Sequence, residues 1–471
     1  MSFQDQWANP KRDYWATIKS CAFGHYTAQN MANVANGKVI LFPGMLNPSD
    51  YANNALTSPK VELWDPETNS FSLLADAPAG LLDYSITILR DGRIVISGGH
   101  TPTQDVGNGP FFNPGYWLTI SDKIYIYTPS TNMWATAASV LPTPLHAHQS
   151  VQLNNGKVLF FGGITNTPFP PNSIETDGFG NIIKAHGIVN SYLWDPVADT
   201  IAATGSMAKP RLFFTPVKLN DGRIMAIGGL PKVVSFSVFP SLIQPPLQDS
   251  IEVYNPVSGV WSDGTLPEVA GTFLTMPVIP NDFSPGVIPP GYPFPGGIVF
   301  DNALDDRMAP GAAVLTDGTV LIIGGTGLCA QPAFYAGLGL GRASCLVVDP
   351  KTGLFTQVDS IPRVGAVYPV AVVSLRNGQI LHICWNEGYD SDARAVHLFN
   401  QFTRKWELGA DMPSSNIVVG LVGPVPQSDI LVGSTFRTQN KDFVAGSNTF
   451  EKVLIGPGFP ALAATYYVPK L

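Results

Sequence analysis

The segment VELWDPETNSF, residues 61–71, is typical of a β-hairpin. Asp65 followed by Pro66 predicts a type I turn, because the Asp side chain caps the turn and proline supplies a backbone φ of about −65°. Apolar residues flank this turn, and Phe71 stands five residues after the proline. The stretch therefore predicts two short antiparallel strands joined by a tight turn.

The same hairpin recurs along the chain, with a weaker copy, QWANPKRDYW, at residues 6–15. An apolar residue, mostly aromatic, stands five residues after the proline position of each copy; in the last copy Gln401 replaces proline and Trp406 keeps the spacing. Such internal repetition predicts a repeat architecture. The further copies are IYIYTPSTNMW (124–134), YLWDPVADTI (192–201), IEVYNPVSGVW (251–261), LVVDPKTGLF (346–355) and VHLFNQFTRKW (396–406).

A second motif precedes each hairpin: Asn-Gly or Asp-Gly, then a short apolar run that mostly ends in Gly-Gly. Asx-Gly between apolar segments predicts a hairpin with a type I′ turn, because both central residues of that turn need positive φ. The apolar run is typical of a strand buried on both faces. We expect the Gly-Gly to let neighbouring backbone approach where a side chain would clash. The copies are NGKVILFPG (36–44), DGRIVISGG (91–99), NGKVLFFGG (155–163), DGRIMAIGG (221–229), DGTVLIIGG (317–325) and NGQILHICW (377–385).

The spacing of the two motifs predicts a closed ring. From the apolar residue of one hairpin to the next Asx-Gly glycine the distance is 21 to 23 residues in five of six cases, and the sixth contains a Pro-rich insertion at 277–308. The same spacing from Trp406 reaches QSDILVGST, residues 427–435, a degenerate seventh copy. We therefore predict an all-β, seven-bladed β-propeller with four-stranded antiparallel blades, formed by residues 1–471 as a single domain.

Both chain ends are expected to share the last blade of this ring. Residues 1–20 carry an outer hairpin without inner strands, and the last inner-strand copy lies near the C-terminus. Pairing them would remove an open sheet edge. Residues 440–471 follow this last copy, and we expect them to form extra strands or an appendage.

These features resemble the kelch-repeat family and, more loosely, the central propeller of galactose oxidase. The matching features are the Gly-Gly after the second strand and the aromatic residue about six positions past the third. The chain departs from the pattern at Pro43-Gly44, Cys384-Trp385 and Ser434-Thr435. The copper site of galactose oxidase would need a Tyr-His pair, and the nearest dipeptide, His25-Tyr26, is reversed. The resemblance therefore implies the fold without the copper-site residues.

Composition narrows the class of protein. The net charge is −8 and the 27 basic residues are scattered, so nothing predicts a nucleic-acid partner. Charged residues make up 13% of the chain, against about 25% in a typical domain. The N-terminal segment has no apolar signal region, and no apolar run has the length of a membrane helix. We therefore expect a cytoplasmic protein, or one incorporated into a virus-like particle, without membrane insertion.

The connections that vary in length are expected to gather on one face of the ring. In an antiparallel blade, the segment between the second and third strands and the connection between blades leave on the same side. Variable loops on a fixed scaffold usually carry recognition, and amphipathic aromatic residues suit a protein interface or a sugar platform. The alternative is that these residues pack under their own loops. The candidates are Phe111, Phe112, Tyr116, Trp117, Phe236, Phe239, Tyr292, Phe294, Phe334, Tyr335, Trp385 and Tyr389.

Metal ligation has weaker candidates. His146 and His148 are two residues apart on a predicted inner strand, so both would point to one side and could share a metal. Asp390 and Asp392, like Asp301, Asp305 and Asp306, offer clustered oxygen atoms for calcium. Hydrogen-bonded histidines near the axis and solvated acidic turns are the alternatives.

Two classes of function remain open. The first, our prediction, is a non-catalytic binding or structural propeller without a cofactor, which recognises a protein or a glycan. One version is a subunit of a larger assembly, such as the tail or host-recognition structure of a virus or phage. The second class is a metal-dependent oxidase or lyase that uses the axial histidines. Metal analysis of the purified protein distinguishes the two.

Overall fold

The computed structural model describes the chain in segments, and these segments are built from β-strands and turns. No helix in the described part has the length and apolar character to cross a membrane. The described residues are 14–18, 22–23, 31–34, 38–45, 57–65, 67–68, 70–101, 119–165, 182–235, 249–265, 267–277, 279, 307, 310–327, 340–341, 343–362, 368–374, 378–385, 396–409, 432–433, 453–456 and 464–468.

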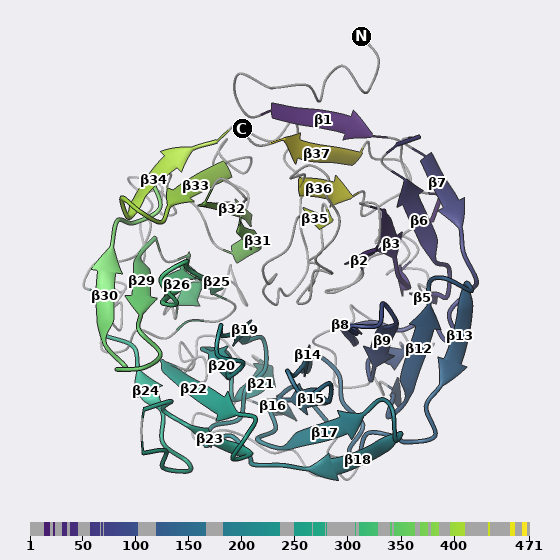
Figure 1. The fold of residues 1–471 in the computed structure, drawn as a ribbon, viewed down its shortest axis with the longest axis horizontal. Coiled ribbons are helices and arrows are strands. Elements are labelled where there is room, and N and C mark those ends of the chain that lie inside the picture. Colours follow the sequence, from purple (N-terminus) through teal and green to yellow (C-terminus); the bar gives the residue numbers. More distant parts are fainter. Residues whose placement is uncertain are drawn as a thin grey trace.

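Six four-stranded antiparallel sheets form the blades of a β-propeller, and in each blade the strands follow chain order from the inside of the ring outward (Figure 1). The first three blades are β2 (Met31–Asn33), β3 (Val39–Leu41), β6 (Glu62–Asp65) and β7 (Ser70–Leu73); β8 (Ser85–Ile88), β9 (Ile94–Ser97), β12 (Ile124–Thr128) and β13 (Met133–Thr136); and β14 (Gln149–Gln152), β15 (Val158–Phe161), β17 (Ser191–Asp195) and β18 (Thr200–Ala203). The fourth to sixth blades are β19 (Thr215–Lys218), β20 (Ile224–Ile227), β22 (Ser250–Asn255) and β23 (Val260–Ser262), with β24 (Leu274–Thr275) added beside β22; β25 (Gly311–Val314), β26 (Val320–Ile323), β29 (Cys345–Val348) and β30 (Phe355–Val358); and β31 (Tyr368–Ser374), β32 (Gln379–Trp385), β33 (Val396–Asn400) and β34 (Lys405–Leu408).

The predicted count of seven blades is wrong for the described residues, which form six blades of the repeated kind. The two chain ends instead form a separate sheet in the order β1 (Tyr14–Ile18), β37 (Ala464–Val468), β36 (Val453–Gly456) and β35 (Val432–Gly433). In this sheet β35 runs parallel to β36, so the sheet is not an antiparallel blade made by successive hairpins. The chain termini nevertheless meet in one sheet, which lies in the ring between the sixth and first blades (Figure 1).

The hydrophobic core lies between adjacent blades. Between the second and third blades, for example, Val95 and Ile124 of one blade pack with Phe160 and Trp194 of the next. Comparable clusters join the first and second, third and fourth, fourth and fifth, and fifth and sixth blades. Because the buried strands carry apolar side chains on both faces, each of the second to fifth blades is stabilised by burial against both neighbouring blades.

In three of the hairpins, the tryptophan that closes the hairpin contacts the preceding blade. The indole N–H of Trp134 donates to the Ala75 carbonyl at 3.1 Å, and that of Trp261 donates to Ser191 Oγ at 3.0 Å. In the sixth blade the Trp406 indole donates to the Asp359 carbonyl at 2.9 Å. The repeated aromatic position in the sequence therefore serves packing between blades.

The Gly-Gly pairs allow the backbone of the following blade to approach. The N–H of Gly99 donates to the Leu145 carbonyl at 2.8 Å, and a Cβ on Gly98 would overlap that carbonyl oxygen. Equivalent hydrogen bonds join Gly163 to the Arg211 carbonyl at 2.9 Å and Gly229 to the Arg307 carbonyl at 2.8 Å. The expected role of these glycines is confirmed.

The Asx-Gly turns differ from the predicted type I′ geometry. In the second blade only Gly92 has a positive φ, of 85°, and Asp91 does not. The Gly92 N–H donates to the Leu89 carbonyl at 2.9 Å, and the Leu89 N–H donates to the Arg93 carbonyl at 2.7 Å. This is a three-residue connection, a type I turn followed by a left-handed glycine, which demands only one positive φ.

Candidate functional site

The accessory strands of the propeller lie in the segments between the second and third strands of the blades. Because successive turns of an antiparallel blade alternate between its two ends, these segments share one face with the connections between blades, which we call the loop-rich face. Here β16, between β15 and β17, pairs with β21, between β20 and β22, so neighbouring blades are joined. The accessory sheets are β4 (Gly44–Met45) with β5 (Thr57–Ser58), β10 (His100–Thr101) with β11 (Thr119–Ile120), β16 (Ile182–His186) with β21 (Lys232–Ser235), and β27 (Thr326–Gly327) with β28 (Leu340–Gly341).

The aromatic candidates for recognition lie almost entirely outside the described residues. Trp385 is the exception, because its backbone ends β32. The acidic candidates Asp390 and Asp392, and Asp301, Asp305 and Asp306, also lie outside them, as does most of the insertion at 277–308. The aromatic candidates outside are Phe111, Phe112, Tyr116, Trp117, Phe236, Phe239, Tyr292, Phe294, Phe334, Tyr335 and Tyr389.

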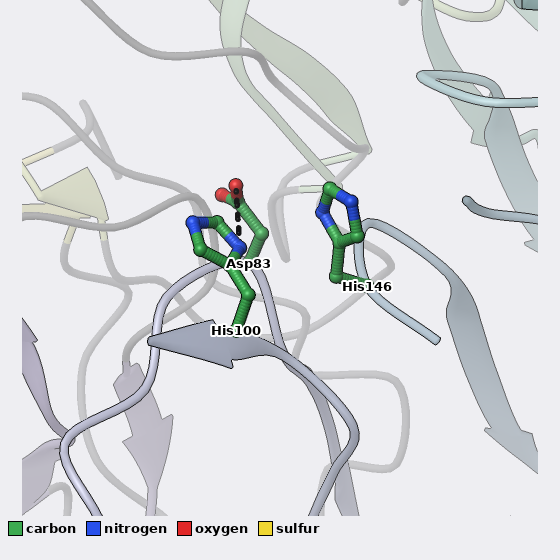
Figure 2. Close-up of side chains that lie close together, drawn as sticks. All are labelled: Asp83, His100 and His146. Atoms are coloured by element: carbon green, nitrogen blue, oxygen red, sulfur yellow. Dashed lines mark ion pairs between the residues drawn. The ribbon is translucent and has the colours of Figure 1, made fainter. Parts of the chain in front are cut away.

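Three ionisable side chains meet on the loop-rich face, between the second and third blades. They are Asp83, which precedes β8; His100, which follows β9; and His146, which precedes β14 (Figure 2). One ligand atom from each residue lies within 4.8 Å of the other two. The His100 Nδ1 atom is 3.6 Å from Asp83 Oδ2, and the two imidazole rings are 4.9 Å apart between centroids.

Backbone hydrogen bonds fix the two residues of the second blade in this cluster. Leu82 and His100 exchange both backbone hydrogen bonds, each at 2.9 Å, which places Asp83 directly beside β10. Asp83 itself has a left-handed backbone, with φ of 50°, and its carbonyl accepts the Ala147 N–H at 2.7 Å. The second blade is thus joined to the connection that carries His146.

His146 is held in the same manner by the third blade. Its N–H donates to the Ile164 carbonyl at 3.0 Å, and the Ile164 N–H donates back at 2.9 Å. Nearby, the buried Ser150 hydroxyl of β14 lies 2.5 Å from both Ser85 Oγ and Thr87 Oγ1 of β8. The side chains of the cluster therefore project from backbone that is fixed within and between the two blades.

Burial decides the charge of the two histidines. His100 is 2% exposed and His146 8% exposed. Burial lowers the pKa of His100 from 6.5 to about 4. Burial, together with the neighbouring His100, lowers the pKa of His146 to about 3, although Asp83 opposes that shift. Both imidazoles are consequently neutral at pH 7, which is the form that binds metals.

Asp83 is the more accessible member of the cluster, because its side chain keeps 16% exposure. Burial raises the pKa of its carboxyl group, and protonation of His146 would act in the opposite direction. Among the described residues, the Nδ1 atoms of His100 and His146 have no hydrogen-bond partner. The cluster thus presents two neutral nitrogen donors and one carboxylate, and its imidazoles retain unused binding capacity.

The structure pairs His146 with different residues from those predicted. His148 is fully buried and directs Nε2 to Ser97 Oγ at 2.9 Å, with its ring against Phe160, whereas His146 lies beside His100. The predicted alternation fails because β14 begins only after His148 and the intervening Ala147 has φ of 52°.

Sequence reasoning missed Asp83 and His100. A signal was available by comparing equivalent positions of the repeats. His100 directly follows the Gly-Gly of the second blade, where the third and fourth blades have Ile164 and Leu230. The fifth blade has Thr326 at this position, so among these four blades the second alone has a metal-ligating side chain there, and this departure is more informative than the repeat itself.

Comparisons with known proteins support the fold. No family model matches the chain. The N-acetylneuraminate epimerase of Yersinia enterocolitica (serotype O:8, biotype 1B) is 24% identical over 143 residues, which cover 29% of this chain and 33% of the epimerase. The match thus spans about a third of the length of this curated relative.

Two solved structures resemble the fold at low sequence identity. The structure of YjhT has a TM-score of 0.47 and 14% identity, covering 83% of this chain and 98% of YjhT. A fungal alcohol oxidase of the AA5 family, in complex with copper, has a TM-score of 0.51 and 12% identity, covering 86% of this chain and 68% of the oxidase. The similarity to the oxidase agrees with a β-propeller.

Proposed function

We propose that this chain is a kelch-like binding propeller that recognises a protein or a glycan through its loop-rich face. The observation that carries the proposal is that the accessory sheets of the described chain all lie in the segments of this face. A scaffold elaborated on one side only is the usual arrangement for recognition.

The opposite face supports the proposal by its uniformity. Its third-to-fourth-strand turns repeat one side-chain contact, in which an Asx oxygen accepts a backbone N–H two residues later. Asp65 binds the Glu67 N–H at 2.9 Å, Asp195 binds that of Val197 at 3.0 Å, and Asn400 binds that of Phe402 at 3.0 Å. Short turns of constant chemistry close the blades and leave little surface for specific recognition.

A metal-dependent oxidase or lyase was the alternative, based on His146 and His148. The structure directs these two side chains to different partners, and the comparisons support the fold alone. Incorporation into a virus or phage particle stays a prediction, which copurification from the native source would test.

Trimming one loop tests the proposed function. Thr101 of β10 is paired with Thr119 of β11, so replacing residues 102–118 by Asn-Gly closes a two-residue hairpin at the existing register. This change removes Phe111, Phe112, Tyr116 and Trp117 together. The matched control is Phe402→Ser, which removes an aromatic residue that is 73% exposed in a turn of the opposite face.

Binding would be measured on a glycan array and against proteins that copurify from the native source. The wild type is expected to bind a defined ligand, the trimmed variant to bind it at least about 10-fold more weakly, and Phe402→Ser to bind it unchanged. A second variant would be trimmed at 328–339. The proposal would be contradicted if both trimmed variants bound the ligand as tightly as the wild type. Absence of any glycan or protein ligand for the wild type would also contradict it.

A further inference from the structure

We propose that Asp83, His100 and His146 bind one divalent first-row transition metal of the zinc class. This inference goes beyond the proposed function, because loop-mediated recognition does not require a metal. Two imidazoles and one carboxylate are a donor set found in zinc sites that keep an open coordination position. Calcium and magnesium prefer sites made of oxygen atoms, so the two nitrogen donors disfavour them.

The distances allow coordination after small side-chain movements. Bonds of about 2.1 Å in a tetrahedral arrangement place ligand atoms about 3.4 Å apart. His100 Nδ1 and Asp83 Oδ2 are already 3.6 Å apart, and the most widely separated atoms of the cluster lie within 4.8 Å. The backbone of all three residues is fixed by hydrogen bonds, so the ligand atoms would come closer together by side-chain rotation.

Charge and polarity favour a cation at this position. Buried imidazole nitrogen atoms without hydrogen-bond partners are costly, and both His100 Nδ1 and His146 Nδ1 are in this state within the described structure. A divalent ion would bind both nitrogen atoms, and the Asp83 carboxylate would offset part of its charge. Asp83 also retains 16% side-chain exposure, which gives an ion access from the loop-rich face.

The site also joins two blades. Asp83 and His100 belong to the second blade, and His146 belongs to the connection that enters the third. An ion bound by all three residues would link the blades only in the folded ring. Metal binding should therefore raise the midpoint of thermal unfolding by mass action.

Titration of the metal-free protein tests the site. Chelator-treated protein would be titrated with ZnCl₂ by calorimetry and with CoCl₂ by visible absorption, which reports coordination geometry. The wild type is expected to bind one equivalent of either metal. His100→Ala, His146→Ala and Asp83→Asn should each weaken binding by roughly 100-fold or more, because each removes a direct ligand.

His186→Ala is the matched control, since His186 lies on β16 of the same face outside the cluster. It should bind zinc and cobalt like the wild type. Binding that is unchanged in all three cluster variants, or lost equally in His186→Ala, would overturn the proposal. Failure of the wild type to bind either metal at one equivalent would do the same.

X-ray absorption at the zinc edge of the wild-type protein needs no variant and so covers the case in which a variant fails to fold. Two imidazole ligands and only nitrogen and oxygen donors are expected. A sulfur ligand, or fewer than two imidazoles, would contradict the assignment. Neither measurement depends on the recognition ligand, so failure of the metal site and failure of the proposed function are distinguishable.

Discussion

Substitution of Gly98 by alanine tests how adjacent blades are joined. Gly98 has φ of 60° and lies where the backbone of the following blade approaches. A Cβ at this position would overlap the Leu145 carbonyl oxygen and would lie 2.7 Å from His148 Cε1. The Leu145 carbonyl also accepts the Gly99 N–H, so moving it away would break the hydrogen bond between the blades.

The expected cost has three parts. An alanine in the left-handed region costs about 1–2 kcal/mol. The overlap with packed backbone adds about 1–3 kcal/mol, and loss of the Gly99 hydrogen bond adds about 1 kcal/mol. Gly98→Ala should therefore lower the free energy of unfolding by about 3–6 kcal/mol. Gly92→Ala is the matched control, because φ there is 85° and a Cβ would meet nothing within 4 Å, which leaves a cost of about 1–2 kcal/mol.

Urea unfolding of the metal-free protein, followed by tryptophan fluorescence and by circular dichroism, would measure both variants. Coincident transitions from the two probes are needed before the free energies are compared, because a ring of this size can unfold in steps. If Gly98→Ala loses no more stability than Gly92→Ala, the blades are not joined by close approach at the Gly-Gly pair.

Three further predictions concern other parts of the ring. Arg211→Met should lower the free energy of unfolding by about 3–5 kcal/mol, because it leaves the buried Glu252, whose Oε1 atom lies 2.8 Å from Arg211 Nη2, without its ion-pair partner. Adding Glu252→Leu should recover part of this stability in urea unfolding, and no recovery would contradict the argument. Burial is the main cause that holds the pKa of His382 well below 6.5, and the neighbouring His397 is the second, so the neutral form of His382 stabilises the fold fully above pH 6.5 and this contribution is lost as the pH falls below that value. His382→Phe should therefore reduce the slope of the unfolding free energy against pH between about pH 7.5 and pH 5, to which the buried His100 and His146 also contribute; an unchanged slope would refute the assignment. Trp15 of β1 pairs directly with Tyr467 of β37, so cysteines at these two positions should form an intramolecular disulfide on oxidation. If mass spectrometry found only free thiols or dimers, closure of the ring by β1 and β37 would be contradicted.

The repeated elements of the fold were predictable from the sequence because local chemistry determines them. Asx-Pro turns, Asx-Gly turns and short apolar runs specify short strands, and their regular spacing specifies blades. Six blades follow these rules in the structure. The terminal sheet was predicted only in part, because the pairing of β35 parallel to β36 depends on long-range contacts that leave no local signature.

The candidate site was less predictable, because its members come from three separate segments. Asp83 and His100 are 17 residues apart, and His146 belongs to a different blade connection. The β8–β9 hairpin brings the end of β9 beside the residues that precede β8, and only the packing of adjacent blades adds the residues that precede β14. The spacing of His146 and His148 suggested a shared metal, but the positive φ of Ala147 directs the two side chains to different partners, His100 and Ser97.

Anomalous diffraction from crystals grown with one equivalent of Zn²⁺ would show directly whether the loop-rich face holds a metal between the second and third blades. We predict one strong peak at the zinc edge, within bonding distance of His100, His146 and Asp83. An intact ring with no peak at this cluster, or with its strongest peak at another pair of histidines such as His382 and His397, would contradict it.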